Sequence, residues 1–154
     1  MHADLWTFSL ETYAKPGVEE ACLALQAQGA DVCLMLCAAW LGVRGVSCEA
    51  GRLAQLRLVA QPWQAQVVQP LRQLRGQWRA MALQDSELKV LRDQVKALEL
   101  EAERQLLLRL EGLCRDWPQG MADDLMAWLD GSTAQAAHLS RDALQQLRVA
   151  VSKA

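Results

Sequence analysis

The stretch LWTFSLETYAKPGVEEACLALQAQGADVCLMLCAAWL, residues 5–41, decides the fold class, because three apolar segments in it are separated by helix start and stop signals. Pro16 suits a first helical position, Gly29 ends a segment, and Asp31 can cap the next helix. Residues Val32 to Leu41 are apolar on every side, which is typical of a helix surrounded by others. We therefore expect three helices here, with the third at the centre of the core.

Residues 47–81 are expected to form two helices. Ser47 can cap a helix that runs to about Ala60, and Pro62 can open the next one. Pro70 lies inside the apolar pattern of the second helix. It should kink that helix, because proline lacks a backbone donor and crowds the preceding turn.

A long amphipathic helix is predicted over residues 86–117. Its apolar residues recur about every 3.6 residues, which is the period of a straight helix rather than of a left-handed coiled coil. Leu91 and Leu98 are therefore expected on the core side of this helix. Glu99 and Glu103 are expected on its polar side.

No segment shows the sustained apolar and polar alternation of a strand. We predict an all-α, single-domain bundle of about six to eight helices over residues 1–154, with its core within residues 5–81. C-terminal helices are expected over residues 122–152. A chain of 154 residues is long enough to bury a core of its own without metal or disulfides.

The composition is that of a globular protein, with 52% hydrophobic and 22% charged residues. A net charge of −2 gives no general attraction to nucleic acid or membranes. The first ten residues lack the basic segment of a secretory signal, and the longest apolar run is far shorter than the roughly 20 residues that span a bilayer. Five cysteines, an odd number, favour reduced thiols over a disulfide framework. We expect a cytoplasmic protein with no membrane association.

Residue patterns for catalysis or metal binding are absent from the sequence. There is no Gly-x-Ser-x-Gly turn and no Cys-x-x-Cys pair, and His2 and His138 lie at opposite ends of the chain. Asp123, Asp124 and Asp130 depart from the spacing of magnesium-binding aspartate motifs, so a position near a helix N-terminus explains them more simply. The sequence favours a non-enzymatic role without metal or cofactor.

Basic residues are concentrated in the middle of the chain, where residues 44–79 hold six arginines and one acidic residue. Arg72, Arg75 and Arg79 are spaced three and four apart, so they form one stripe on a helix, with Val68 at its head. Guanidinium groups suit carboxylate and phosphate partners. The stripe either docks a partner or pairs with acidic residues of the first two helices or of the long helix within the molecule.

Six tryptophans against one phenylalanine and one tyrosine is an unusual aromatic composition. Trp6, Trp40, Trp63 and Trp78 all fall in the first half of the chain or close to it. Packing in the core and at its boundary accounts for most of them, because tryptophan buries a large area. Some of these four could instead line a ligand pocket.

Five motifs carry a resemblance to a known family: W-x-F-S-L at 6–10, Y-A-K-P-G-V at 13–18, A-C-L-A-L-Q at 21–26, G-A-D-V at 29–32 and P-L-R-Q-L-R-x-x-W at 70–78. Over about residues 5–80 the chain resembles an uncharacterised family of small proteobacterial cytoplasmic helical proteins, known as a domain of unknown function. The resemblance implies a bacterial, cytoplasmic origin and supplies no catalytic residue.

Two functions remain open at this point. We expect a non-enzymatic interaction or adaptor protein that docks a protein partner or a second copy through the Arg stripe or the apolar surface of the long helix. An acidic or phosphate ligand also suits the stripe, whereas nucleic acid is disfavoured because no exposed aromatic residues or lysines interleave with it. The alternative is a helical small-molecule binder or enzyme with a Trp-lined pocket and an Arg anion clamp.

Overall fold

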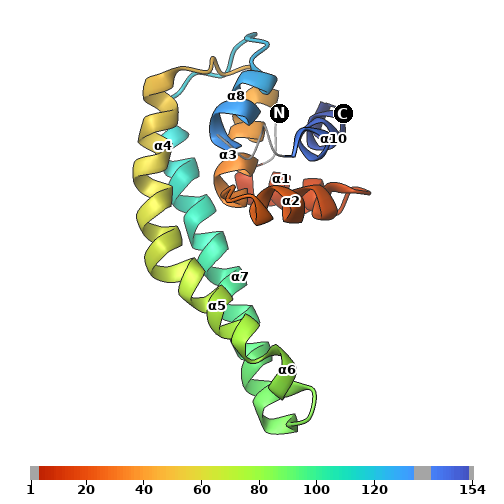
Figure 1. The fold of residues 1–154 in the computed structure, drawn as a ribbon. Coiled ribbons are helices and arrows are strands. Elements are labelled where there is room, and N and C mark those ends of the chain that lie inside the picture. The colour runs from red at the N-terminus through yellow and green to blue at the C-terminus, as the bar shows by residue number, and fades with distance from the viewer. Residues whose placement is uncertain (1–3, 134–139, 153–154) are drawn as a thin grey trace.

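The protein consists of a helical head and a projecting arm, in which two helical segments of the chain run side by side (Figure 1). The computed structural model describes residues 4–133 and 140–152 and contains no strand within them. The head contains α1 (Leu5–Tyr13), α2 (Val18–Ala27), α3 (Val32–Val43), α8 (Leu125–Thr133) and α10 (Arg141–Ser152). The arm contains α4 (Ala50–Trp63), the π-helical turn η1 (Gln64–Val68), α5 (Gln69–Gln77) and α6 (Arg79–Ala82), which lie beside α7 (Ser86–Cys114). The predicted all-α class with one long helix is confirmed.

The first three helices form where the sequence predicts them. The Asp4 carboxylate caps α1 by accepting a hydrogen bond from the Thr7 N–H at 2.7 Å. Gly17 precedes α2 in the left-handed conformation, with φ of 82°, so α2 begins just after the predicted proline start. The Asp31 carboxylate caps α3 by accepting from the Leu34 N–H at 3.1 Å.

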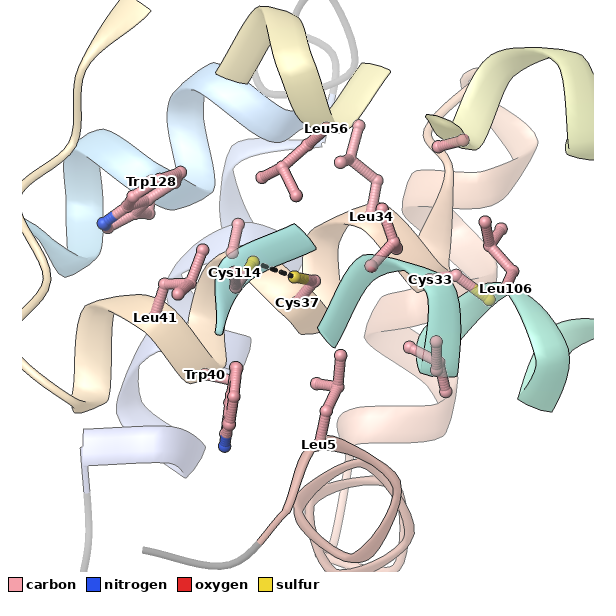
Figure 2. Close-up of a cluster of buried hydrophobic side chains, with 14 of the residues drawn as sticks. Leu5, Cys33, Leu34, Cys37, Trp40, Leu41, Leu56, Leu106, Cys114 and Trp128 are labelled. Carbon is pink, nitrogen blue, oxygen red and sulfur yellow. Dashed lines mark hydrogen bonds between the residues drawn. The ribbon is translucent and has the colours of Figure 1, made fainter. Parts of the chain in front are cut away.

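Helix α3 is the centre of the core, because every side chain from Cys33 to Leu41 is buried (Figure 2). One side of α3 faces a cluster shared with the base of the arm, which includes Leu106 and Leu110 of α7. The other side faces α2, α8 and α10. Gly42 lets α8 approach closely, since a Cβ there would lie 2.8 Å from the Leu125 Cα. The core therefore extends beyond the predicted 5–81 segment.

The helix predicted to open at Pro62 does not begin there, because α4 continues through this residue and η1 and α5 follow without a break. The Gln69 N–H donates to the Gln64 carbonyl, five residues earlier, so this turn is wider than an α-helical one. In a regular α-helix the Pro70 ring would crowd the Gln66 carbonyl. The wider turn accommodates the proline, and the chain needs no new helix start.

The buried face of α7 also differs from the prediction. Leu91 and Leu98 are 49% and 57% exposed, although the apolar period places them on the core side. Glu99, expected on the polar side, is only 7% exposed. The reason lies across the arm, where the arginines of α5 bind the Glu99 carboxylate at the interface between α5 and α7. The helix ends at Cys114 rather than at Trp117.

The C-terminal helices α8 and α10 lie within the predicted range of residues 122–152. Helix α8 begins at Leu125, three residues after the start of that range. The Asp124 carbonyl accepts from the Trp128 N–H at 2.9 Å, and the Asp124 carboxylate accepts from the Cys48 N–H at 2.7 Å. His2 and His138 lie outside the described residues. Within the ranges that the structure describes, no helix is long and apolar enough to cross a bilayer.

Candidate functional site

A cleft of about 760 Å³ lies where the arm leaves the head. One wall is a single face of α1, formed by Trp6, Ser9, Leu10 and Tyr13 at helical spacings of three and four. A second wall comes from α7 and carries Lys96, Glu99, Leu100, Glu103 and Leu107. The start of α3, the η1 turn and α5 form much of the rest, and α2, α4 and the end of α8 contribute further residues. The cleft is thus built from segments that are far apart in the sequence.

Large apolar side chains stay exposed around this cleft. Their exposed fractions lie between 36% and 55%, and the residues are Leu10, Tyr13, Leu23 and Leu100. Isolated apolar residues on a protein surface need no explanation. Four that gather in one concave site are typical of a surface that covers a ligand or a partner.

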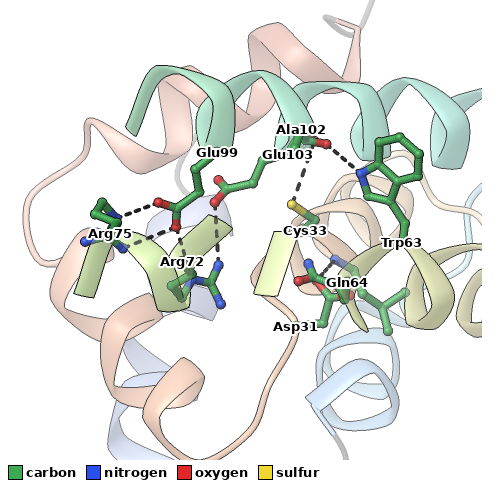
Figure 3. Close-up of polar contacts among 10 residues, drawn as sticks. Asp31, Cys33, Trp63, Gln64, Arg72, Arg75, Glu99, Ala102 and Glu103 are labelled. Atoms are coloured by element: carbon green, nitrogen blue, oxygen red, sulfur yellow. Dashed lines mark hydrogen bonds and ion pairs between the residues drawn. The ribbon is translucent and has the colours of Figure 1, made fainter. Parts of the chain in front are cut away.

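A cluster of ion pairs forms the polar side of the cleft (Figure 3). The Arg75 guanidinium donates twice to Glu99, with Nε to Oε2 at 2.6 Å and Nη2 to Oε1 at 3.2 Å. Arg72 bridges two carboxylates, with Nε 3.2 Å from Glu99 Oε1 and Nη2 3.5 Å from Glu103 Oε1. Burial raises the pKa of Glu99, but the hydrogen bonds and charges of the two arginines outweigh it and hold the pKa below its usual value.

The predicted Arg stripe is therefore divided by the structure. Arg72 and Arg75 pair with the long helix inside the molecule, which is one of the two alternatives that the sequence leaves open. Arg79 lies in α6, is exposed, and makes no ion pair with any residue in the described ranges. Val68 is buried in the arm and offers no surface.

Two further carboxylates line the cleft, and nearby positive charges neutralise them less than they neutralise Glu99. Asp31 Oδ1 accepts from the Leu34 N–H at 3.1 Å and from Gln64 Nε2 at 2.9 Å, so this residue joins the head to η1 (Figure 3). Burial raises the pKa of Asp31. Burial also raises the pKa of Glu103, and the neighbouring Glu99 charge adds to that shift while Arg72 opposes it. Both carboxylates are thus less stable in their charged form than they would be in water.

The α1 wall contributes two hydroxyl groups. Ser9 is 5% exposed, and its Oγ has no hydrogen-bond partner within the described part of the chain. A buried hydroxyl without a partner is uncommon and calls for an explanation. Burial raises the pKa of Tyr13 to about 12, so its phenol stays neutral near pH 7.

The tryptophans predicted as a possible pocket are not brought together. Trp6 lines the cleft, whereas Trp40 is 5% exposed in the core under the Arg44 guanidinium. Trp63 packs on α7, where its Nε1–H donates to the Ala102 carbonyl at 2.9 Å. Trp78 lies at the junction of α5 and α6. Trp40 and Trp63 therefore serve the packing of the head and arm, and Trp6 is the one of the four that lines the cleft.

The cysteines are placed for packing. All five are free, and Cys37 Sγ lies 3.8 Å from Cys114 Sγ inside the core (Figure 2). The hydrogen bond with Cys114 raises the pKa of the Cys37 thiol, and burial adds to the shift. Burial likewise raises the pKa of Cys22 to about 12. Neutral, enclosed thiols are poor nucleophiles. In the described ranges no group of three or more His, Cys, Asp or Glu residues could hold a metal ion.

Sequence reasoning missed most of the cleft. The spacing of Trp6, Ser9, Leu10 and Tyr13 is a signal that was available, because it places them on one face of a predicted helix. The contributions of Asp31 and Glu103 had no such signal. They depend on α3 and α7 meeting in space, which no local pattern encodes.

The comparisons with known proteins identify a family without an assigned activity. A family model described as "Protein of unknown function (DUF2390)" matches residues 4–110, which is more than half of the chain. The matched segment includes α1, α3, α5 and the part of α7 that lines the cleft. No curated protein and no solved structure shows significant similarity to the chain. The chain therefore belongs to the DUF2390 family of proteins of unknown function.

Proposed function

We propose that this protein is a non-enzymatic binding protein that holds an amphipathic small molecule in the cleft between the head and the arm. The observation that carries the proposal is the ring of half-exposed apolar side chains around a polar base in one concave site. Its volume of about 760 Å³ falls in the range of roughly 300–1,000 Å³ that is common for small-molecule sites. This function is the small-molecule alternative that the sequence leaves open. Of the four tryptophans expected to line its pocket, only Trp6 lines the cleft.

The chemistry of the lining supports binding rather than catalysis. Glu99 binds both Arg72 and Arg75, and Arg72 also contacts Glu103, so both guanidinium groups are engaged before a ligand arrives. Burial raises the pKa of the Tyr13 phenol and of the Cys33 thiol, so both stay protonated near pH 7, and a neutral phenol or thiol is a poor nucleophile and cannot accept a proton as a general base. These groups can shape and orient a molecule without reacting with it.

The proposal is tested by filling part of the cleft with a larger side chain. Ala65 is exposed, lies on η1 and lines the cleft, so Ala65→Trp should occupy part of the volume without disturbing the core. Ala97→Trp is the matched control, because Ala97 is exposed on α7 and does not line the cleft. Each protein is incubated with a small-molecule extract of bacterial cells, recovered by gel filtration and examined by native mass spectrometry.

The proposal predicts a noncovalent 1:1 adduct with the parent and with Ala97→Trp, and its loss in Ala65→Trp. Circular dichroism of the two variants checks that both keep the parental helix content. The absence of any adduct, or an adduct that all three proteins retain equally, would contradict binding in the cleft.

A second candidate function is the protein–protein interaction that the sequence favours, with the exposed surface of the arm as the contact site. Met81 and Leu83 near its tip are 56% and 85% exposed, and Leu91 and Leu98 along α7 are half-exposed. Because Arg72 and Arg75 are paired internally, this contact would use the apolar residues and Arg79, and a second copy is the simplest occupant. Sedimentation equilibrium tests it. A dimer that dissociates in the Leu83→Glu, Leu91→Glu double variant supports it, and a monomeric parent contradicts it.

A bacterial cytoplasmic setting is part of the proposal. The resemblance over residues 5–80 supports it, and so do the five free cysteines, because disulfides are rare where thiols are kept reduced.

A further inference from the structure

Negative charge at the base of the cleft is only partly compensated. The Asp31 carboxylate accepts hydrogen bonds from Leu34 and Gln64 and has no ion pair within the described residues, and burial raises its pKa although the Cys33 N–H and the Arg72 charge oppose that shift. The Glu103 carboxylate has one ion pair, with Arg72, and that contact is long at 3.5 Å. Asp31 and Glu103 both line the cleft, and the Asp31 charge adds to the burial that raises the pKa of Glu103. Two carboxylates without close cationic partners therefore lie in the lining of one cleft.

The positive groups of the lining are engaged or distant. Arg75 is bound by Glu99, and Arg72 is shared between Glu99 and Glu103. The Arg57 guanidinium donates to the Gly131 carbonyl. Lys96 precedes Glu103 by seven residues on α7, and a rise of about 1.5 Å per residue separates their backbones by about 10 Å.

The remaining groups describe an amphipathic occupant. Leu100 lies on α7 one turn before Glu103, and Leu10 and Leu23 extend the apolar surface across the cleft. Ser9, on the α1 wall, has a buried hydroxyl without a partner. An independent sign of a missing partner thus lies in the same site as the two carboxylates.

We propose that the cleft binds an amphipathic amine, whose protonated nitrogen contacts Asp31 and Glu103 and whose apolar body covers Leu10, Leu23 and Leu100. This inference rests on the function proposed above and names the class of ligand. An ammonium group supplies a positive charge to both carboxylates, together with N–H donors in addition to those they already have. A carboxylate or phosphate at the same place would add a third negative charge to two that already repel each other.

Three probes with the same eight-carbon chain test the charge requirement. Octylamine, octanoate and 1-octanol are titrated into the whole protein at pH 7 by isothermal calorimetry. We expect octylamine to bind at least about tenfold more tightly than either of the others, because hydrogen bonds between an ammonium and a carboxylate are stronger than those between neutral groups.

Amide variants test the residues. Asp31→Asn and Glu103→Gln should each weaken octylamine by about tenfold and leave 1-octanol unchanged, since they remove the charge and keep the shape. Glu101→Gln is the control, because Glu101 is exposed on the same helix and does not line the cleft. The two variants lie on different elements, so a folding defect in one leaves the other informative.

The outcomes separate this inference from the function on which it rests. Octanoate or 1-octanol binding as tightly as octylamine, with all three lost in Ala65→Trp, overturns the amine preference and leaves the small-molecule function standing. Octylamine binding that neither amide variant weakens also overturns it. If none of the probes binds, the inference is wrong, and the extract experiment decides the proposed function by itself.

Discussion

Replacing Glu99 tests whether the arm is held by a buried carboxylate. Glu99 is 7% exposed and binds two arginines of α5 across the interface with α7. Glu99→Ala leaves Arg75 with no ion pair among the described residues and leaves Arg72 with only its longer contact to Glu103. We therefore expect a loss of stability that comes mainly from two half-buried cations without a partner.

The size of the loss follows from the exposure of the three side chains. Removing one partner of a fully buried ion pair costs about 3–5 kcal/mol, whereas exposed pairs contribute about 0–1 kcal/mol. The Arg72 and Arg75 side chains are 23% and 30% exposed, so water can reach them after the change. An intermediate value of about 2 kcal/mol is expected for Glu99→Ala, or about 4–8 °C in Tm for a domain of this size.

Urea unfolding at pH 7 measures the effect, and Glu101→Ala is the control. Glu101 lies on the same helix but is exposed, and its contact with Arg104 is 3.5 Å long. The control should therefore change the free energy of unfolding by less than about 0.5 kcal/mol. Equal stabilities of the two variants at pH 7 would refute the argument that Glu99 holds the arm.

The pH dependence gives a second check on Glu99. Its pKa is lowered in the folded protein, so its contribution is present above the ordinary value of 4.5 and disappears as the pH falls through the folded pKa. The stability difference between the parent and Glu99→Ala should therefore shrink on acidification. A difference that stays constant down to pH 3 would contradict the ion-pair explanation.

Three other predictions concern single side chains. Asp31→Asn should keep or raise the free energy of unfolding at pH 7. The pKa of Asp31 is raised in the folded protein, so the stability that its carboxyl group contributes at low pH is lost as the pH rises, and asparagine caps a helix equally well. A loss above about 1 kcal/mol in urea unfolding would contradict this. Ser9→Ala should add about 1 kcal/mol by removing a buried hydroxyl without a partner, and a thermal melt without any gain would show that the hydroxyl is satisfied. With a thiol reagent Cys48, which is half-buried, should react first, and the four buried cysteines only as fast as the protein unfolds; rapid native labelling of any of those four would contradict their enclosure.

The head was predictable because its signals are local. Asp31 caps α3 from the position that the sequence assigns to it, and the uniformly apolar run that follows is buried along its length. Both features require only the neighbouring residues and the helical period. The order of the first three helices could therefore be written from residues 5–41 alone.

The arm was less predictable because its register depends on residues that are far apart in the sequence. The period of α7 fits Leu98 and Glu99 to the core side almost equally well, since they follow the buried Val95 by three and four residues and so lie on either side of the same stripe. Hydrophobicity favours Leu98, but the residues that decide are Arg72 and Arg75, which precede Glu99 by 27 and 24 positions. The helix start predicted at Pro62 is wrong for a related reason. Proline is a local signal for a helix start, but here it lies inside a continuous helix.

The position of the cleft follows from the same division between head and arm. Beyond η1, helix α5 packs on α7 without a third layer from the head, so this interface is partly exposed and can contain charged groups. Arg72 and Arg75 neutralise Glu99 there. Glu103 lies one turn deeper and retains only the longer contact with Arg72. The negative charge that remains uncompensated therefore lies next to the apolar walls that the head contributes to the cleft. Because charge and apolar surface meet there, the junction of head and arm is a better candidate for ligand binding than the Arg stripe.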